Sequence, residues 1–288
     1  MPADVSSRPG PSAPPAPQGV TQRVPGVPVL RATLRRERRS TIVWMLAMGA
    51  MSALYWGLWP TIRDDPAIAE LKAQSLGRVG DAMGFSDLST SAKYLDATVF
   101  GLLGPLLLII FAVIAGSRAV AGDDEQGLLD LYLAQPVSRA RYLVERMGAL
   151  VVQVGLLAGT VALVVVALDV VQDSGLATGD LVTGAAGLGL VGLTFGLVAV
   201  VMGAVVGRRG PAVGVAAGAA LLTYLAYGFS SQISALADLR YLSPFWWFGG
   251  HAPASGGLTR TALAVLVAVP VVLAAVAVPA FDRRDVGV

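Results

Sequence analysis

Six apolar stretches dominate this chain and limit what it can fold into. A helix that crosses a bilayer core of about 30 Å needs roughly 20 consecutive apolar residues. The mean hydropathy is +0.68, with 55% hydrophobic and 14% charged residues, which is outside the usual range of soluble domains. The sequence therefore predicts an all-α integral membrane protein with six transmembrane helices, at 42–60, 95–120, 147–171, 181–206, 212–229 and 261–281.

Basic residues predict how these spans are oriented. Cytoplasmic segments near the ends of spans carry an excess of Lys and Arg. If the N terminus lies inside, the inner segments hold most of the 21 basic residues, including the run RRERR before the first span. We therefore predict an N-in, C-in orientation.

The segments before the first span have a different character. Residues 1–28 hold eight of the 17 prolines among Ser, Ala and Gly, which predicts a disordered cytoplasmic tail ahead of a six-span domain at 29–286. The run VLRATLRRERRS follows, with Leu30, Leu34 and Ile42 at helical spacing among arginines. This pattern predicts an amphipathic helix lying in the membrane interface before the first span.

The spans are poor in charge and rich in small residues. The stretches 147–168, 181–206 and 261–280 carry no charged residue. Ion-coupled pumps need buried ionisable groups, so this composition disfavours an ion-driven mechanism. Glycine pairs at 192/196, 203/207 and 214/218 predict helices that approach one another closely.

A charged segment at 121–146 separates the second span from the third. Asp123 is a good helix cap, Gln126 completes a box-like arrangement, and Asp124 and Glu125 face the positive end of the helix dipole. Pro136 ends this helix, and Ser138 is positioned to cap the next one, which leads into the third span. The apolar arc of the loop helix contains Leu128, Leu129, Leu131, Tyr132 and Leu133.

A helix of about 12 residues is marginal in water unless it docks on something. One alternative is that the loop helix rests on the spans of its own chain. Three consecutive acids suit an anionic inner leaflet poorly, which favours a protein partner instead. Glu125 falls inside the apolar arc, where it can meet a basic residue of that partner.

The run GDDEQGLLDLYLAQPVSR, at 122–139, resembles the signature between the second and third spans of type-2 ATP-binding-cassette exporter permeases. The basic segment before the first span, LSPF at 242–245 and FDRRD at 281–285 add to the resemblance, which covers about 30–286. In that family the loop helix is a cytoplasmic coupling helix that sits in a cleft of the ATPase subunit. The resemblance implies that the residues contacting the ATPase partner are Asp123, Asp124, Glu125, Leu128, Leu129, Tyr132, Leu133, Pro136 and Arg139.

The resemblance also implies partners. The only lysines, Lys72 and Lys93, do not follow glycine, so the sequence contains no phosphate-binding loop of the form G-x-x-x-x-G-K-[ST]. We expect no cofactor in this chain, with ATP and Mg bound by a separate ATPase subunit present in two copies. A second permease subunit, identical or homologous, is expected in a bacterial cytoplasmic membrane, and no nucleic acid partner is expected.

Two outer loops are predicted, at 61–94 and 230–257. The second contains the run YLSPFWWF, whose aromatic residues fit an interfacial belt or, by the resemblance, a re-entrant segment that gates an exit path. Thr223, Tyr224, Tyr227 and Phe245 are candidates to line a substrate path, and ordinary helix packing is the alternative for them.

Two other functions remain as alternatives. An intramembrane hydrolase would use Ser230 or Ser231 with His251, which is the only histidine. With no cysteine in the chain, this histidine has no thiolate partner for a zinc site, so we expect a loop residue and no metal or catalytic site. The other alternative is a structural membrane protein without transport activity. The transported substrate is not predicted.

Overall fold

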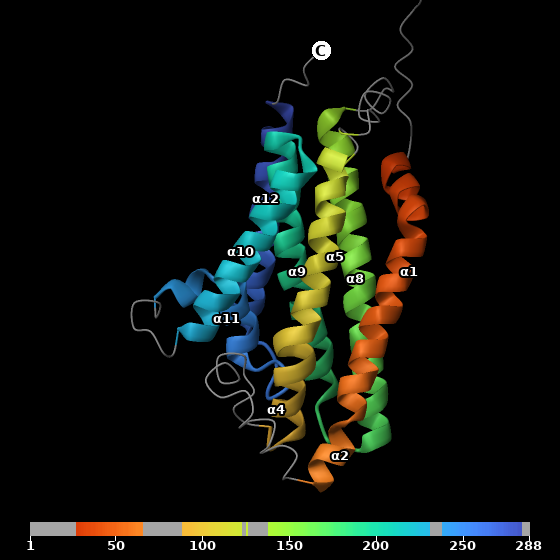
Figure 1. Cartoon of the computed structure of the whole chain (residues 1–288), viewed down its shortest axis with the longest axis vertical. Helices are drawn as coiled ribbons and strands as arrows, with labels where there is room; N and C mark the ends of the chain where they lie inside the picture. The colour runs from red at the N-terminus through yellow and green to blue at the C-terminus, as the bar shows by residue number, and fades with distance from the viewer. Residues whose placement is uncertain (1–26, 66–87, 123–124, 126–137, 231–237, 284–288) are drawn as a thin grey trace, which may run out of the picture.

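The computed structural model describes residues 27–65, 88–122, 125, 138–230 and 238–283. Among these residues, six helices are long and apolar enough to cross a membrane, as the sequence predicts (Figure 1). Their principal segments are α1 (Pro28–Gly57), α5 (Gly104–Ser117), α8 (Arg139–Gln172), α9 (Thr178–Val206), α10 (Arg209–Phe229) and α12 (Arg260–Asp282). Of the tail predicted at 1–28, residues 1–26 lie outside the described residues, and Pro28 already belongs to α1.

The first span differs from its prediction at its start. Helix α1 begins at Pro28 and is continuous to Gly57, so the segment 29–40 is helical, as predicted, and runs into the span without a break. The physical reason is that residues 29–48 contain neither proline nor glycine, while Ala, Leu, Arg and Glu in this stretch favour helix. A short helix, α2 (Trp59–Asp64), follows α1 directly.

The second span is built from several helical segments. Helix α4 (Ser91–Leu95) continues as the π-helix η1 (Asp96–Leu103), then as α5, and ends in a second π-turn, η2 (Arg118–Gly122). Pro105 has no N–H to donate to the preceding turn, and a side chain at Gly104 would collide with the Val99 carbonyl oxygen. These two residues account for the wider helical turns that precede α5.

Helix α9 is the centre of the bundle and contacts α5, α8, α10 and α12. Its approach to α5 is very close, because a side chain at Gly116 would collide with the carbonyl oxygen of Gly196. The predicted glycine pair 192/196 therefore does pack against another span. Gly207 instead ends α9 with a φ of 69°, which suits glycine at a helix C terminus.

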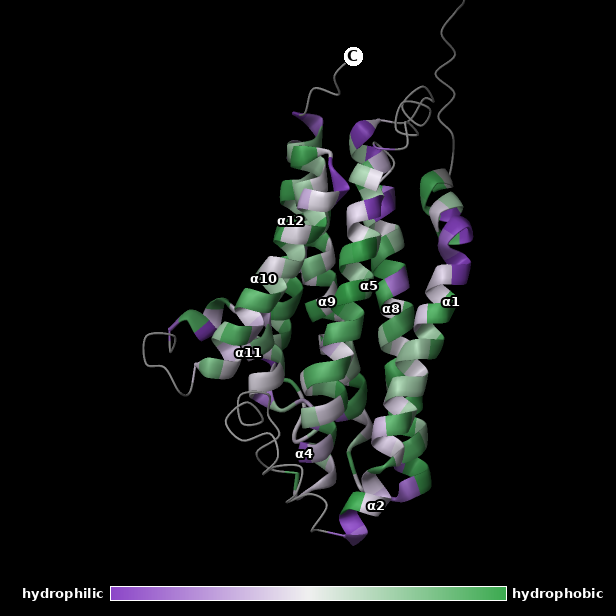
Figure 2. Ribbon diagram, in the orientation of Figure 1, coloured by the Kyte–Doolittle hydropathy of each residue, from purple (hydrophilic) through white to green (hydrophobic). Residues whose placement is uncertain are grey.

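The surface of the bundle is apolar along its middle and polar at its two ends (Figure 2). Exposed leucines and valines, such as Leu46, Leu163 and Leu222, belong to the span helices and fit a lipid environment. Helix α1 lies at the edge of the bundle and packs mainly on α8. We call the end where α1 and α8 begin and α12 ends the basic end, after Arg31, Arg139 and Arg283.

Candidate functional site

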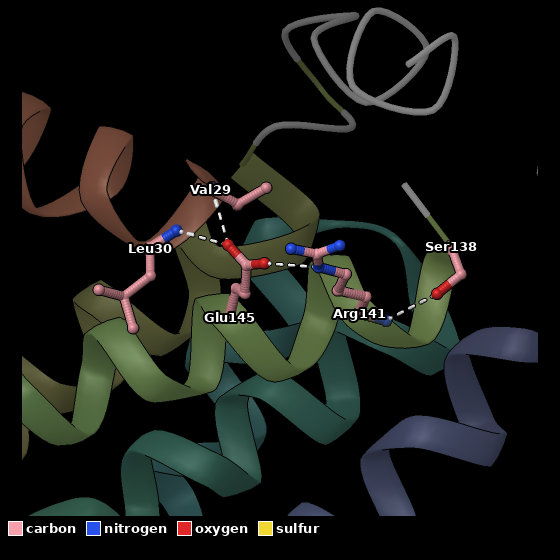
Figure 3. Close-up of polar contacts among 5 residues, drawn as sticks. All are labelled: Val29, Leu30, Ser138, Arg141 and Glu145. Carbon is pink, nitrogen blue, oxygen red and sulfur yellow. Dashed lines mark hydrogen bonds and ion pairs between the residues drawn. The ribbon is translucent and has the colours of Figure 1, made fainter. Parts of the chain in front are cut away.

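The start of α8 organises the basic end of the bundle. Ser138 caps α8 as predicted, because its hydroxyl accepts from the Arg141 backbone N–H at 3.3 Å. One turn later Glu145, which is only 5% exposed, places its carboxylate against the start of α1 (Figure 3). Its Oε2 accepts from the backbone N–H groups of Val29 at 2.8 Å and Leu30 at 3.1 Å. The same carboxylate accepts from Arg141 Nε at 3.0 Å through Oε1.

Glu145 therefore caps a helix that lies more than a hundred residues away in the chain. The residue before α1 is Val27, which has no side chain able to accept from the free N–H groups of the first turn. A carboxylate near a helix N terminus is also favoured by the helix dipole. The contact fastens the start of α1 to the first two turns of α8.

Arg146 extends this connection to two further elements. Its side chain is only 4% exposed. It donates to the Thr33 hydroxyl of α1 at 2.9 Å and to the Tyr142 hydroxyl at 3.2 Å. Tyr142 donates in turn to the Ala119 carbonyl of η2 at 3.3 Å, and its ring stacks on Phe281 of α12. One cluster thus joins α1, η2, α8 and α12.

Gln153 makes a second tie between α8 and α1, two turns deeper in the bundle. Its Nε2 donates to Glu37 Oε2 at 2.8 Å and to Thr41 Oγ1 at 3.3 Å. Sequence reasoning did not identify Glu145, Arg146, Gln153 or Glu37 as functional residues. The available signal was the presence of charged and amide side chains at helical spacing just inside apolar spans, where such groups need partners.

Between η2 and α8 the structure describes Glu125 and the capping residue Ser138. Glu125 Oε1 accepts from the Arg209 backbone N–H, the first residue of α10, at 2.8 Å. Glu125 thus has a partner within its own chain. Arg139, which is also predicted to contact the ATPase, is the first residue of α8. The other predicted partner-contact residues lie outside the described residues: Asp123, Asp124, Leu128, Leu129, Tyr132, Leu133 and Pro136.

At the opposite end, a segment between α10 and α12 packs back onto the bundle. It comprises the turn η4 (Leu239–Leu242), helix α11 (Pro244–Phe248) and the turn η5 (Gly249–His251). Phe245 and Phe248 are buried against protein, so only part of the aromatic run is available for an interfacial belt. Ser243 caps α11 and donates to the Thr223 carbonyl of α10 at 2.9 Å.

Three of the four candidate path residues lie around this segment. Tyr224 meets Phe245 edge to face, with ring centroids 5.1 Å apart, and Tyr227 meets Trp246 at 6.4 Å. The Thr223 hydroxyl instead donates to the Ala219 carbonyl of its own helix at 2.7 Å, which is the packing role that was the alternative for it.

Tyr224 and Phe245 also line a groove between the second span and α10, which we call the outer groove. Its volume is about 180 Å³. The remaining lining is aliphatic and carries no charge: Leu102, Pro105, Leu106, Ile109, Ile110, Ala217, Ala220 and Leu221. Such a groove can take an apolar molecule and offers the Tyr224 and Phe245 rings as its distinctive contacts.

Asp96 fastens the loop after η5 to the second span. Its Oδ1 accepts from the Ala254 backbone N–H at 2.7 Å, and its Oδ2 accepts from the Ser255 hydroxyl at 2.9 Å. Asp96 begins the π-helix η1, so the loop before α12 is held by an irregular part of the second span.

The groups proposed for a hydrolase are engaged elsewhere. Ser230 donates to the Tyr227 carbonyl at 2.7 Å, and His251 stacks on Trp247 with Nδ1 3.3 Å from the Trp246 carbonyl oxygen. No hydrogen bond joins Ser230 to His251 in the described part of the chain, and Ser231 lies outside it. The geometry does not favour a serine nucleophile activated by this histidine.

Comparison with known proteins agrees with a transport role. No match was found among curated proteins. A family model described as "Multidrug efflux system permease Rv1217c, C-terminal domain" matches residues 29–282, which include all six spans. The bundle, its apolar groove and this match lead to one conclusion: the chain belongs to this family of multidrug efflux permeases.

Proposed function

We propose that this chain is the membrane subunit of an ATP-driven exporter, with ATP hydrolysed by a separate ATPase subunit that contacts the loop between η2 and α8. The observation that carries the proposal is that both flanks of this loop are fastened to other helices. Glu125 is bonded to the start of α10, and Glu145 is bonded to the start of α1. The family match supports efflux, and the loop signature supports the ATPase partner.

These contacts define how a displacement of the loop would spread. The loop is covalently continuous with η2 and α8. Through Glu125 a push on the loop reaches α10, which borders the outer groove, and through Glu145 and Arg146 it reaches α1. Coupling requires that the ATPase bind two states of the permease with different affinity, and α10 is the element we assign to change between them.

The outer groove is the substrate path in this proposal. Tyr224 and Phe245 contact the exported molecule, and Tyr227 and Thr223 lie on the same helix as Tyr224. The aliphatic lining favours apolar or amphiphilic molecules, in agreement with a family named for multidrug efflux.

A second permease subunit would complete the transporter. A side chain added at Gly210, Gly214 or Gly218 of α10 would meet no atom of the other described elements within 4 Å. Small residues of this kind let a partner helix approach closely in a membrane. We assign this face of α10 to contact with an identical or homologous permease in a bacterial cytoplasmic membrane, with both termini inside.

The coupling role is tested by transport in proteoliposomes that contain the full chain and the ATPase subunit that purifies with it. We expect Glu125→Arg and Leu129→Asp to abolish ATP-dependent efflux of a hydrophobic dye and the transport-coupled ATP hydrolysis. Both variants should still reach the membrane. Asp64→Arg, an exposed position at the opposite end, is the matched control. Normal transport in both loop variants would reject the proposal.

The tie to α10 is tested without touching the loop. Arg209→Pro removes the N–H that Glu125 binds, and proline is well tolerated at the first position of a helix. The preceding residue, Arg208, is already in the extended conformation that proline requires of its neighbour. Arg209→Ala removes the same charge and keeps the N–H. We expect the proline variant to lose coupling and the alanine variant to retain it, and equal activity of the two would refute transmission through this contact.

A further inference from the structure

A row of contacting aromatic rings runs from the outer groove along α10 and α11 to the turn η4. Phe195 of α9 stacks on Phe245 with centroids 5.6 Å apart, and Phe245 meets Tyr224. One turn further along α10, Tyr227 meets Trp246. The last ring, Tyr241, meets Trp246 edge to face at 5.7 Å.

The positively charged side chain of Arg240 lies at the end of this row of rings. The Arg240 guanidinium lies 4.3 Å from the Trp246 ring centroid and 4.9 Å from that of Tyr241. Both distances are well inside the limit of about 6 Å for a cation–π interaction, and Trp is the strongest of the aromatic partners. The two rings therefore form a box that accepts a flat, delocalised cation.

Arg240 is held in this box by rings and not by a carboxylate. No ion pair of Arg240 occurs among the described residues, which include the nearby Asp238. Its one side-chain hydrogen bond in the described structure goes from Nη2 to the Tyr241 hydroxyl at 2.9 Å, and its buried Nε has no partner there. A guanidinium held this weakly can be exchanged for another cation of similar shape.

The box is also accessible. Tyr241 is 47% exposed, and its neighbours Leu239 and Leu242 are exposed apolar residues. A molecule with an apolar body and a flat positive group would thus find apolar contacts beside the rings. In the outer groove, which has no charged side chain, the rings of Tyr224 and Phe245 are the groups able to stabilise its charge.

We propose that Trp246 and Tyr241 form a binding site for flat organic cations, which Arg240 occupies until such a cation displaces it. The inference deepens the proposed function, on which it rests only for the claim that the bound cation is on its way out of the cell. Arg240 then acts as a resident competitor, so removing it strengthens the binding of an external cation.

The test uses the purified full chain in nanodiscs of zwitterionic lipid and two probes of the same shape. N-methylacridinium is permanently charged, and acridine is neutral at mildly alkaline pH. We expect Arg240→Ala to tighten N-methylacridinium binding by about threefold to tenfold, the range of one cation–π contact, and to leave acridine binding unchanged. Binding is followed by the fluorescence anisotropy of each dye.

A second pair of variants locates the site. In the Arg240→Ala background, Trp246→Leu should abolish the gain. Trp44→Leu is the matched control, because the Trp44 ring of α1 meets Phe111 and makes no contact with Arg240 in the described structure. Unchanged thermal unfolding of these variants verifies that they fold. Weaker or unchanged cation binding in Arg240→Ala would overturn the proposal and make Arg240 a tie that only holds the loop.

These measurements need neither ATP nor a partner. If Arg240→Ala strengthens cation binding while reconstituted transport fails, the cation site stands and the exporter function fails. If transport is normal and the variant has no effect on binding, the exporter stands and the cation site fails.

Discussion

The two ends of the bundle differ in whether their buried polar groups have hydrogen-bond partners. At the basic end, Glu145, Arg146 and Gln153 all have partners on other helices. The opposite half contains every buried side-chain nitrogen or oxygen that lacks a hydrogen-bond partner among the described residues, and these atoms belong to Ser52, Trp56, Asp169, Gln172, Ser174 and Arg240. An unpaired buried group costs about 1–3 kcal/mol unless water reaches it.

This difference indicates which part of the molecule stays rigid and which part rearranges when the loop between η2 and α8 is displaced. A network with every partner in place holds helices in one arrangement, so the basic end moves as a unit. The opposite half has buried groups that gain hydrogen bonds by rearranging or by meeting water. We infer that the basic end is the rigid part and that the opposite half is the part that changes shape.

The largest effect is expected at Glu145. Glu145→Ala leaves the Val29 and Leu30 N–H groups without their acceptor and removes the partner that Arg141 has at that site. The expected loss in the free energy of unfolding is about 3 kcal/mol, the magnitude for breaking a buried charge-assisted contact. SDS titration of the purified chain measures it. Arg35→Ala, at an exposed position, is the control. If Glu145→Ala lowers the free energy of unfolding no more than Arg35→Ala does, the inference that the basic end is rigid is refuted.

Gln153 is expected to have the next largest effect. Gln153→Leu keeps the volume and removes the donor on which Glu37 and Thr41 depend, so we expect a loss of about 1.5 kcal/mol, as for a hydrogen bond to a charged group. Thr160→Ala on the same helix is the control, because its hydroxyl bonds the Leu156 carbonyl of α8 itself and should change stability by under about 0.5 kcal/mol. Equal losses in the two variants would show that the tie to α1 contributes nothing.

How far the sequence predicts this molecule depends on the range of each interaction. The six spans follow from local composition, and the Ser138 cap follows from residues three positions apart. The continuous start of α1 was missed because a basic, Leu-spaced run has the same pattern on a membrane surface as at the end of a span. Local propensity favours helix there, and the Glu145 contact, whose partners are separated by 116 residues, caps its start.

The candidate site shows the same limit. Tyr224 and Phe245 were selected as aromatic residues near a boundary, and the structure does bring them together in one groove. The cation box was not predicted, because nothing in the run LRYLSPFWWF indicates that Arg240 turns back onto Trp246. The predicted contact of the loop helix with an ATPase stays a prediction.

A smaller effect is expected at Asp96, the charged tie of the opposite half. Asp96→Asn keeps an acceptor oxygen for the Ala254 N–H and places an NH2 donor against the Ser255 hydroxyl, so two charge-assisted bonds become neutral ones and the loop should be held less tightly by about 1 kcal/mol. Hydrogen exchange at the Ala254 amide should then be faster by roughly fivefold. Asp64→Asn, at an exposed position, is the control. Unchanged exchange would mean that the loop is held by packing of α11 and not by the carboxylate.

The smallest effect, and the sharpest comparison of the two halves, comes from two serines that are both fully buried. Ser117 donates to the Ile114 carbonyl at 3.0 Å, and the Ser52 hydroxyl has no partner among the described residues. Ser117→Ala should therefore lose about 0.5–1 kcal/mol, whereas Ser52→Ala should be neutral or slightly stabilising, because it removes a group that is buried without a bond. SDS titration of both variants against the unmodified chain decides the matter. If Ser52→Ala is the more damaging of the two, its hydroxyl has a partner after all, and the contrast between the two ends does not hold at this position.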